Sequence, residues 1–140
     1  REATAAALGA AAESVDATET AGAASPAAVD DLLTTVHSDV MEWEPGTTFD
    51  LVVAAYLHMP SSDMRVLWRR LADATAPGGT LVVVGHDTDN AGGGPKDPDV
   101  LFHAEDGTAE LPDGWEVTVA EAVDRGEGSV DALMVARKSR

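Results

Sequence analysis

Two apolar runs that contain no charged residue organise the central part of the chain. They extend from Leu51 to Leu57 and from Leu81 to Gly85. Strands that are apolar on both faces are typical of the middle of a parallel sheet, which helices cover on both sides. We therefore predict two neighbouring parallel strands at these positions.

The residues between the two runs predict a helix that packs on the sheet. Ser61 or Ser62 follows Pro60 as a candidate N-cap. Apolar residues then recur at the positions i, i+3, i+4 and i+7, which form one helix face. These residues are Met64, Leu67, Trp68 and Leu71. Pro-Gly-Gly at positions 77–79 ends the helix, because proline cannot continue it and glycine accepts the turn into the next strand. The unit is a βαβ crossover, which is right-handed in nearly all proteins.

The N-terminal part of the chain has weaker patterns. The segment from Glu2 to Glu13 is rich in alanine, which predicts a helix. Val15–Ala28 is rich in small and polar residues and is interpreted as a flexible linker. Val29–His37 contains β-branched and apolar residues and predicts a third strand. The parallel core would thus contain strands near Leu32, Leu51 and Leu81.

The C-terminal part predicts a cover and a hairpin. Residues 88–98 form a loop rich in glycine and proline, which is long enough for a mobile cover. Asp99–Leu111 contains a candidate short helix. Trp115–Val123 and Ser129–Ala136 are separated by only five residues and predict an antiparallel hairpin.

Composition restricts the class of protein. The 140 residues suit one domain, 1–140, with a single core. The absence of cysteine excludes disulfides and thiolate metal sites and favours a cytoplasmic location. A formal charge of −16 makes nucleic acid a poor partner. No apolar run approaches the roughly 20 residues of a membrane span, and the four histidines lie in separate segments, so no metal site is predicted.

Four polar side chains follow the predicted strands and are candidates for a site. In open α/β sheets, ligands bind beyond the carboxyl ends of the strands. Asp39, Tyr56, His58 and His86 are therefore expected to converge on one rim. His58 and His86 are the candidate catalytic bases, since histidine titrates near neutrality. The alternative, that both histidines bond to backbone groups at the strand ends, remains open.

The segments FDLVVAAYLHMP and LADATAPGGTLVVVGHD resemble the fourth strand, the following helix and the fifth strand of class I S-adenosylmethionine-dependent methyltransferases of the small bacterial type. The resemblance implies an α/β Rossmann-like three-layer sandwich with a mostly parallel sheet and an antiparallel C-terminal hairpin. It also implies S-adenosylmethionine as cofactor. In HSDVM, it places the Asp39 carboxylate on the adenine amino group and Val40 against the ring, and it places Ala55, Tyr56 and Leu57 beside the cofactor.

Two parts of the family pattern do not occur in this sequence. They are the glycine-rich loop after the first strand and the acidic residue after the second strand, which holds the ribose. The glycines at 92–94 follow no suitable strand and are interpreted as loop. The resemblance thus covers the C-terminal two-thirds of a domain that is truncated at its N-terminus. The 140-residue chain is expected to bind the cofactor weakly or not at all, and an exposed sheet edge is expected to favour self-association.

The predicted function is methyl transfer to a small-molecule acceptor. Two alternatives stay open. One is a degenerate, non-catalytic methyltransferase-like domain that binds other proteins. The other is a nucleotide-binding Rossmann protein of a different class.

Overall fold

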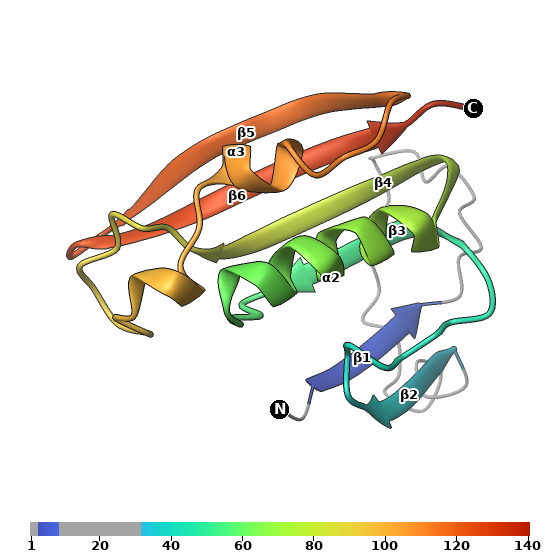
Figure 1. Cartoon of the computed structure of the whole chain (residues 1–140), viewed down its shortest axis with the longest axis horizontal. Coiled ribbons are helices and arrows are strands. Elements are labelled where there is room, and N and C mark those ends of the chain that lie inside the picture. Colours follow the sequence, from blue (N-terminus) through green and yellow to red (C-terminus); the bar gives the residue numbers. More distant parts are fainter. Residues whose placement is uncertain (1–2, 9–31) are drawn as a thin grey trace, which may run out of the picture. The chain divides into compact units, whose positions relative to one another are not determined.

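The computed structural model describes residues 3–8 and 32–140, which fall into two units that are described separately. In the first unit, which ends at Glu44, strand β1 (Ala3–Leu8) pairs antiparallel with strand β2 (Leu33–Ser38), as Figure 1 shows. The linker predicted at 15–28 lies outside the described residues. The expectation of one domain over 1–140 stays a prediction.

Two sequence predictions are wrong in the first unit. Ala3–Leu8 is a strand rather than part of a helix, because the helix preference of alanine is a weak prior that pairing with another strand overrides. Leu33–Ser38 is a strand, as predicted, but it pairs with β1 and not within the parallel core. Thr34 and His37 put polar side chains on opposite faces of β2, whereas a central parallel strand is apolar on both.

The second unit, Pro45–Arg140, contains a four-stranded mixed sheet with the order β3-β4-β6-β5. Its strands are listed here in that order: β3 (Phe49–Ala55), β4 (Thr75–His86), β6 (Ser129–Lys138) and β5 (Trp115–Gly126). β3 and β4 are parallel, while β6 is antiparallel to both of its neighbours. The predicted α/β class and the antiparallel C-terminal hairpin are confirmed, and the parallel part of this sheet is the β3–β4 pair.

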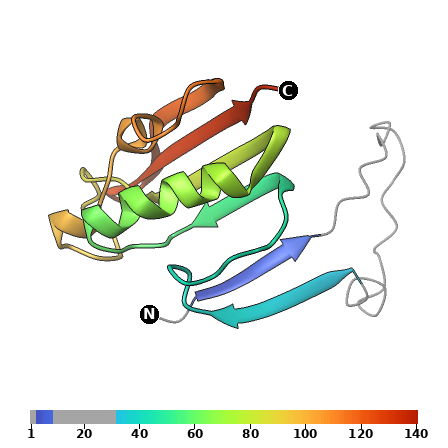
Figure 2. The same ribbon diagram turned by 45° about the vertical axis from the view of Figure 1, so that its right-hand side comes forward.

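Helices α2 (Ser61–Ala74) and α3 (Ala104–Thr108) lie on one face of this sheet (Figures 1 and 2). The predicted apolar face of α2 is buried, with Met64, Leu67, Trp68 and Leu71 all less than a tenth exposed. The predicted serine N-cap is wrong, because Pro60 occupies the N-cap position and no side chain caps the helix. The hydroxyl of Ser61 instead donates a hydrogen bond to Asp99 Oδ1 at 2.8 Å.

The first part of β4, where its register with β3 shifts, depends on glycine. Gly78 has a φ of +79°, and a Cβ on Gly79 would lie 2.8 Å from the carbonyl oxygen of Ala76. The helix itself ends at Ala74, before the Pro-Gly-Gly segment. Lys138 Nζ donates to the carbonyl oxygens of Ala72 and Thr75 at 3.0 and 2.9 Å, which satisfies acceptors at the helix end.

A 3₁₀ helix, η1 (Pro98–Val100), and α3 connect the parallel pair to the hairpin. The short helix predicted within Asp99–Leu111 is confirmed over Ala104–Thr108. No helix in the described part of the chain is long and apolar enough to cross a membrane.

Apolar side chains remain exposed on the strands at both ends of the sheet order. Leu51 and Val53 on β3 are 57% and 56% exposed, and they alternate along the strand with the buried Ala54. Val117 on β5 is 43% exposed. Since side chains alternate between the faces of a strand, Leu51 and Val53 lie on the face opposite to that of Ala54.

Candidate functional site

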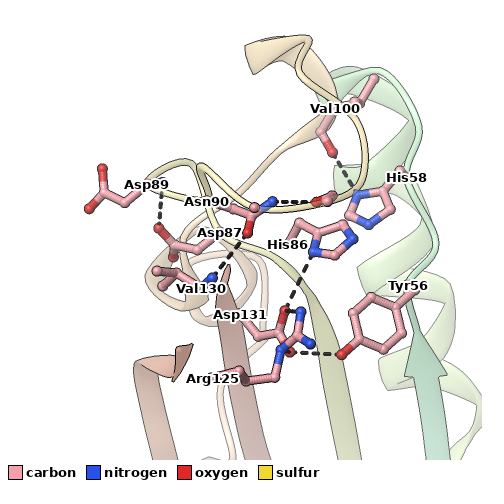
Figure 3. Close-up of polar contacts among 12 residues, drawn as sticks. Tyr56, His58, His86, Asp87, Asp89, Asn90, Val100, Arg125, Val130 and Asp131 are labelled. Atoms are coloured by element: carbon pink, nitrogen blue, oxygen red, sulfur yellow. Dashed lines mark hydrogen bonds and ion pairs between the residues drawn. The ribbon is translucent and has the colours of Figure 1, made fainter. Parts of the chain in front are cut away.

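Three of the predicted site residues lie together at the carboxyl ends of β3 and β4. Tyr56 and His58 follow β3, and His86 is the last residue of β4. The rings of His58 and His86 are stacked, with centroids 5.1 Å apart and planes 8° apart, while the ring of Tyr56 lies 5.2 Å from that of His86 (Figure 3). The predicted convergence is therefore observed for these three residues.

The hydrogen bonds of His58 define its tautomer. Its Nδ1 lies 3.0 Å from the carbonyl oxygen of Val100 in η1. A carbonyl oxygen can only accept, so Nδ1 carries the proton and Nε2 of the neutral ring has the lone pair. Nε2 is buried, and no group in the described residues is hydrogen-bonded to it. His58 thus bonds to the backbone, as the alternative anticipated, and its basic nitrogen is enclosed by the surrounding residues.

The aromatic side chains of Phe102 and Trp68 pack between the stacked histidines and the rest of α2. Phe102 is 5% exposed and lies edge-on to the ring of Trp68, with centroids 5.3 Å apart. A Cβ on Gly85 would lie 2.7 Å from Phe102 and 3.3 Å from His58. Glycine at this position of β4 therefore gives both rings room on the sheet.

A buried carboxylate lies below the rim. Asp131 on β6 is 4% exposed and accepts a hydrogen bond from the Tyr56 hydroxyl at 2.7 Å. Arg125 Nε lies 2.6 Å from Asp131 Oδ2, and a second guanidinium nitrogen donates to Oδ1 at 3.0 Å. Burial raises the pKa of Asp131, but the bonds from Tyr56 and Arg125 outweigh burial, so the pKa lies below its ordinary value. The hydrogen bond to Asp131 is also the main cause that raises the pKa of Tyr56.

Tyr56 has a backbone conformation that is uncommon outside glycine. Its φ is +52°, in the left-handed region, which is costly for a bulky residue. Its backbone N–H donates to the carbonyl oxygen of Val84 at 2.8 Å. Backbone strain of this kind is concentrated at functional sites.

The glycine-rich loop contacts the same rim. Asn90 fastens the loop, because its side chain donates to the Gly93 carbonyl oxygen at 2.7 Å and accepts from Val130 N at 3.0 Å. Gly94 has a φ of +98°, and a Cβ on it would lie less than 3.0 Å from two atoms of the His86 ring. The loop therefore lies directly against His86. That residues 88–98 move as a cover stays a prediction.

A histidine–carboxylate pair lies at the base of the loop. His103 Nδ1 is 3.2 Å from Oδ2 of Asp87, which is 1% exposed. Burial lowers the pKa of His103, but Asp87, with smaller effects of Asp106 and Asp89, outweighs burial and raises the pKa above its usual value. The pair joins the end of β4 to the N-terminus of α3.

The predicted adenine-binding residues belong to the first unit. Asp39 follows β2, and its Oδ1 accepts a hydrogen bond from Met41 N at 2.8 Å. Val40 is half-buried beside it. In the second unit, Ala55 ends β3 and pairs with Val84. Leu57 is half-buried. The roles assigned to these residues and to Tyr56 stay predictions.

The sequence patterns did not point to Asp131 and Arg125. Asp131 stands within Ser129–Ala136, which was used only as the final strand. A signal was present, because Asp131 is the single charged residue of that segment. Aspartate is rarely fully buried without a partner. Arg125 lies in the part of β5 that was interpreted as the hairpin loop.

A cavity of about 200 Å³ opens at the opposite end of the sheet. It is lined by Glu116, Arg137, Lys138, Ser139 and Arg140. Thr80, at the other end of β4 from His86, pairs with Arg137, whereas His86 pairs with Asp131. The cavity therefore lies away from the histidines. No group of acidic or histidine side chains suited to a metal ion occurs in residues 3–8 and 32–140.

No protein-family model matches the chain, and none of the curated proteins matches it by sequence. Solved structures do match. The N-methyltransferase NodS from Bradyrhizobium japonicum WM9 has a TM-score of 0.58 and 20% identity, over 74% of this chain and 58% of that protein. NodS has also been solved with S-adenosyl-L-homocysteine.

Two further structural neighbours differ from each other in the reaction that their names give. A 1,6-didemethyltoxoflavin-N1-methyltransferase from Burkholderia thailandensis matches with a TM-score of 0.54 and 18% identity, over 75% of this chain and 50% of that protein. The [4+2]-cyclase SpnF has the same score and identity, over 73% and 54%. The chain thus shares the fold of these proteins and spans about half to three-fifths of their length. Fold alone does not determine the reaction, since function depends on the residues of the site.

Proposed function

We propose that the chain takes part in methyl transfer from S-adenosylmethionine to a small molecule that carries an N–H or O–H group. The observation that carries this proposal is the position of Tyr56, His58 and His86. They lie at the carboxyl ends of a parallel strand pair, in a fold shared with methyltransferases. This is the edge of an α/β sheet where ligands bind.

The residues proposed for the adenine side of the cofactor come from both units, and the support for each comes from its own unit. Only Oδ1 of the Asp39 carboxylate has a hydrogen bond within the described residues, so Oδ2 is available for an amino group. Val40, Ala55, Tyr56 and Leu57 are the proposed apolar and backbone contacts. No glycine-rich turn that could bind the methionine end follows a strand in residues 32–87, since Pro-Gly-Gly at 77–79 lies within β4, directly after a helix. The fit is therefore partial.

His58 is the proposed general base. When bound, the cofactor would supply an electrophilic methyl group, and an N–H or O–H acceptor must lose a proton as it is methylated. Nε2 of His58 has the lone pair that can take this proton because Val100 keeps the other ring nitrogen protonated. Since Nε2 is buried, this role requires the groups around it to move when the acceptor binds. His86 supports the ring of His58 by stacking. Phe102 limits the access of water from below.

Titration of the ¹⁵N-labelled 140-residue chain with S-adenosylhomocysteine, followed by NMR, tests the proposal. Signals of Asp39, Val40 and Tyr56 should shift, with a dissociation constant near the millimolar range. Each missing polar anchor costs on the order of 1–3 kcal/mol, and about 1.4 kcal/mol corresponds to a factor of ten.

Two controls make the titration specific. Adenosine should compete, since the proposed contacts are on the adenine side, and free methionine should not. If none of the three residues responds to millimolar ligand, the proposed function is wrong. A low micromolar dissociation constant would instead refute the argument from missing anchors.

A non-catalytic binding function is the second candidate. The exposure of Leu51 and Val53 on β3, at one end of the sheet order, favours it. In that case neither S-adenosylhomocysteine nor adenosine should shift the signals of Tyr56 and Leu57, and the apolar face of β3 should be the surface that associates.

A further inference from the structure

The carboxylate of Asp131 connects groups from every strand of the second unit. It lies on β6 and binds the Tyr56 hydroxyl, which follows β3, and the guanidinium of Arg125 on β5. Nδ1 of His86, at the end of β4, is buried and lies 3.5 Å from Asp131 Oδ1, within reach of an electrostatic attraction but without a hydrogen bond. Figure 3 shows these side chains pointing toward one another. One buried group thus touches the rim and the stacked histidines.

Burying the Asp131 carboxylate in this arrangement costs folding free energy. A carboxylate that is 4% exposed loses its hydration, and well-packed apolar residues in place of such a cluster are often neutral or stabilising. The neighbours of Asp131 on β6 are apolar, with Ala132 and Met134 almost fully buried. Tyr56 adds the cost of its left-handed backbone. The Asp131 cluster is therefore weak evidence for a purely stabilising role.

We propose that Asp131 is the positioning residue of the site, an inference that rests on the proposed function. Because the negative carboxylate attracts a proton on the nearer ring nitrogen, Asp131 favours the tautomer of His86 that carries its proton on Nδ1. It thereby orients the His86 ring, on which His58 stacks. The same carboxylate binds the hydroxyl of Tyr56 at the rim. Asp131 touches neither acceptor nor cofactor and acts through Tyr56 and His86.

Asp131→Asn in the 140-residue chain is the direct test, with Glu121→Gln as the matched control. Glu121 is an exposed residue of β5, so its change removes one negative charge from the same sheet without touching the cluster. Tyr56 is the only tyrosine, so absorbance near 295 nm reports its ionisation alone. The pKa of Tyr56 should move down toward its ordinary value in Asp131→Asn and stay unchanged in Glu121→Gln.

The second readout is the tautomer of each ring, measured from ¹⁵N shifts of the imidazoles. In the unmodified chain, the Nδ1–H form should predominate for both His58 and His86. Asp131→Asn should change the tautomer ratio of His86, while His58 keeps its form because Val100 is unchanged. If Asp131→Asn unfolds, Tyr56→Phe replaces it. That variant keeps Asp131 with Arg125, and His86 should then retain the Nδ1–H form.

The outcomes separate this inference from the proposed function. If Asp131→Asn changes neither the Tyr56 titration nor the His86 tautomer, Asp131 does not position them. If Tyr56→Phe abolishes the Nδ1–H form of His86, the tautomer depends on Tyr56 rather than on Asp131, and the inference is again wrong. If both readouts change as expected but the unmodified chain shows no response to S-adenosylhomocysteine, the contacts of Asp131 are real and the function is wrong. Weaker adenosine binding in Asp131→Asn than in Glu121→Gln supports both.

Discussion

The glycine loop over the rim can be tested with two neighbouring substitutions. Gly94 has a φ of +98°, and an added Cβ would overlap the ring of His86. Gly93 has no atom within 4 Å of the same added group and no positive φ. Gly94→Ala and Gly93→Ala therefore make the same chemical change, one against the site and the other in open space.

The expected difference follows from two costs that only Gly94→Ala meets. A left-handed conformation costs an alanine roughly 1–2 kcal/mol, and overpacking costs about 1–3 kcal/mol. The gain of about 0.4–1 kcal/mol from a stiffer unfolded chain applies to both variants and cancels. The difference in unfolding free energy should thus be about 2–5 kcal/mol. The loop could instead detach from the sheet. It would then lose the two hydrogen bonds of the Asn90 side chain and the two that the backbone N–H groups of Ala91 and Gly92 donate to the Gly128 carbonyl oxygen. At about 1 kcal/mol for each bond, the loss of unfolding free energy would be similar.

Urea unfolding followed by tryptophan fluorescence measures this difference. The imidazole NMR signals of His86 provide a local readout, and they should shift in Gly94→Ala and stay in place in Gly93→Ala. Stabilities equal within about 0.5 kcal/mol, a typical effect of a surface substitution, together with unchanged His86 signals, would refute the packing of the loop on this ring.

Three further predictions concern pH, association and the adenine contact. The pKa of His103 lies above its unfolded value of about 6.5. Its stabilising effect is therefore complete below that pH and is lost as pH rises through the folded pKa, so His103→Gln should flatten the fall in unfolding free energy above about pH 6.5; an unchanged profile would contradict this. The exposed Leu51 and Val53 should drive weak self-association, which sedimentation velocity would detect and lysine at both positions should abolish; an unmodified chain that stays monomeric at high concentration would disprove it. Asp39→Ala should weaken binding of adenosine by about 1–3 kcal/mol, or roughly five- to 150-fold, and an equal affinity by NMR titration would remove Asp39 from the site.

The central crossover was predictable because its local signals agree. The charge-free runs form β3 and β4, and the apolar face of the intervening helix is buried as its spacing predicts. The N-terminal strand was not predictable, because Ala3–Leu8 has alanines that favour a helix locally and becomes a strand only through pairing with β2. Local propensity carries no information about such a distant partner.

The candidate site was predictable only in part for a related reason. Tyr56, His58 and His86 follow strands, and the end of a parallel strand is a position that sequence patterns can identify. Asp131 and Arg125 reach the rim from the antiparallel hairpin, whose register with β4 places Asp131 opposite His86. A single sequence does not reveal that register, so these contacts needed the structure.

The net charge of the chain bears on the charge of the proposed methyl acceptor, which the fold leaves open. With 25 acidic and 9 basic residues, the protein has a formal charge of −16, and its field repels anions over distances near a Debye length, about 8–10 Å at moderate salt. Near the rim, the cationic side chain of Arg125 is already paired with Asp131. An anionic acceptor would therefore meet an unfavourable field without a free partner in the cluster. A neutral or cationic molecule that donates an N–H or O–H hydrogen bond would suit this charge, and it would suit the lone pair on Nε2 of the neutral His58 ring once the groups that bury this atom move.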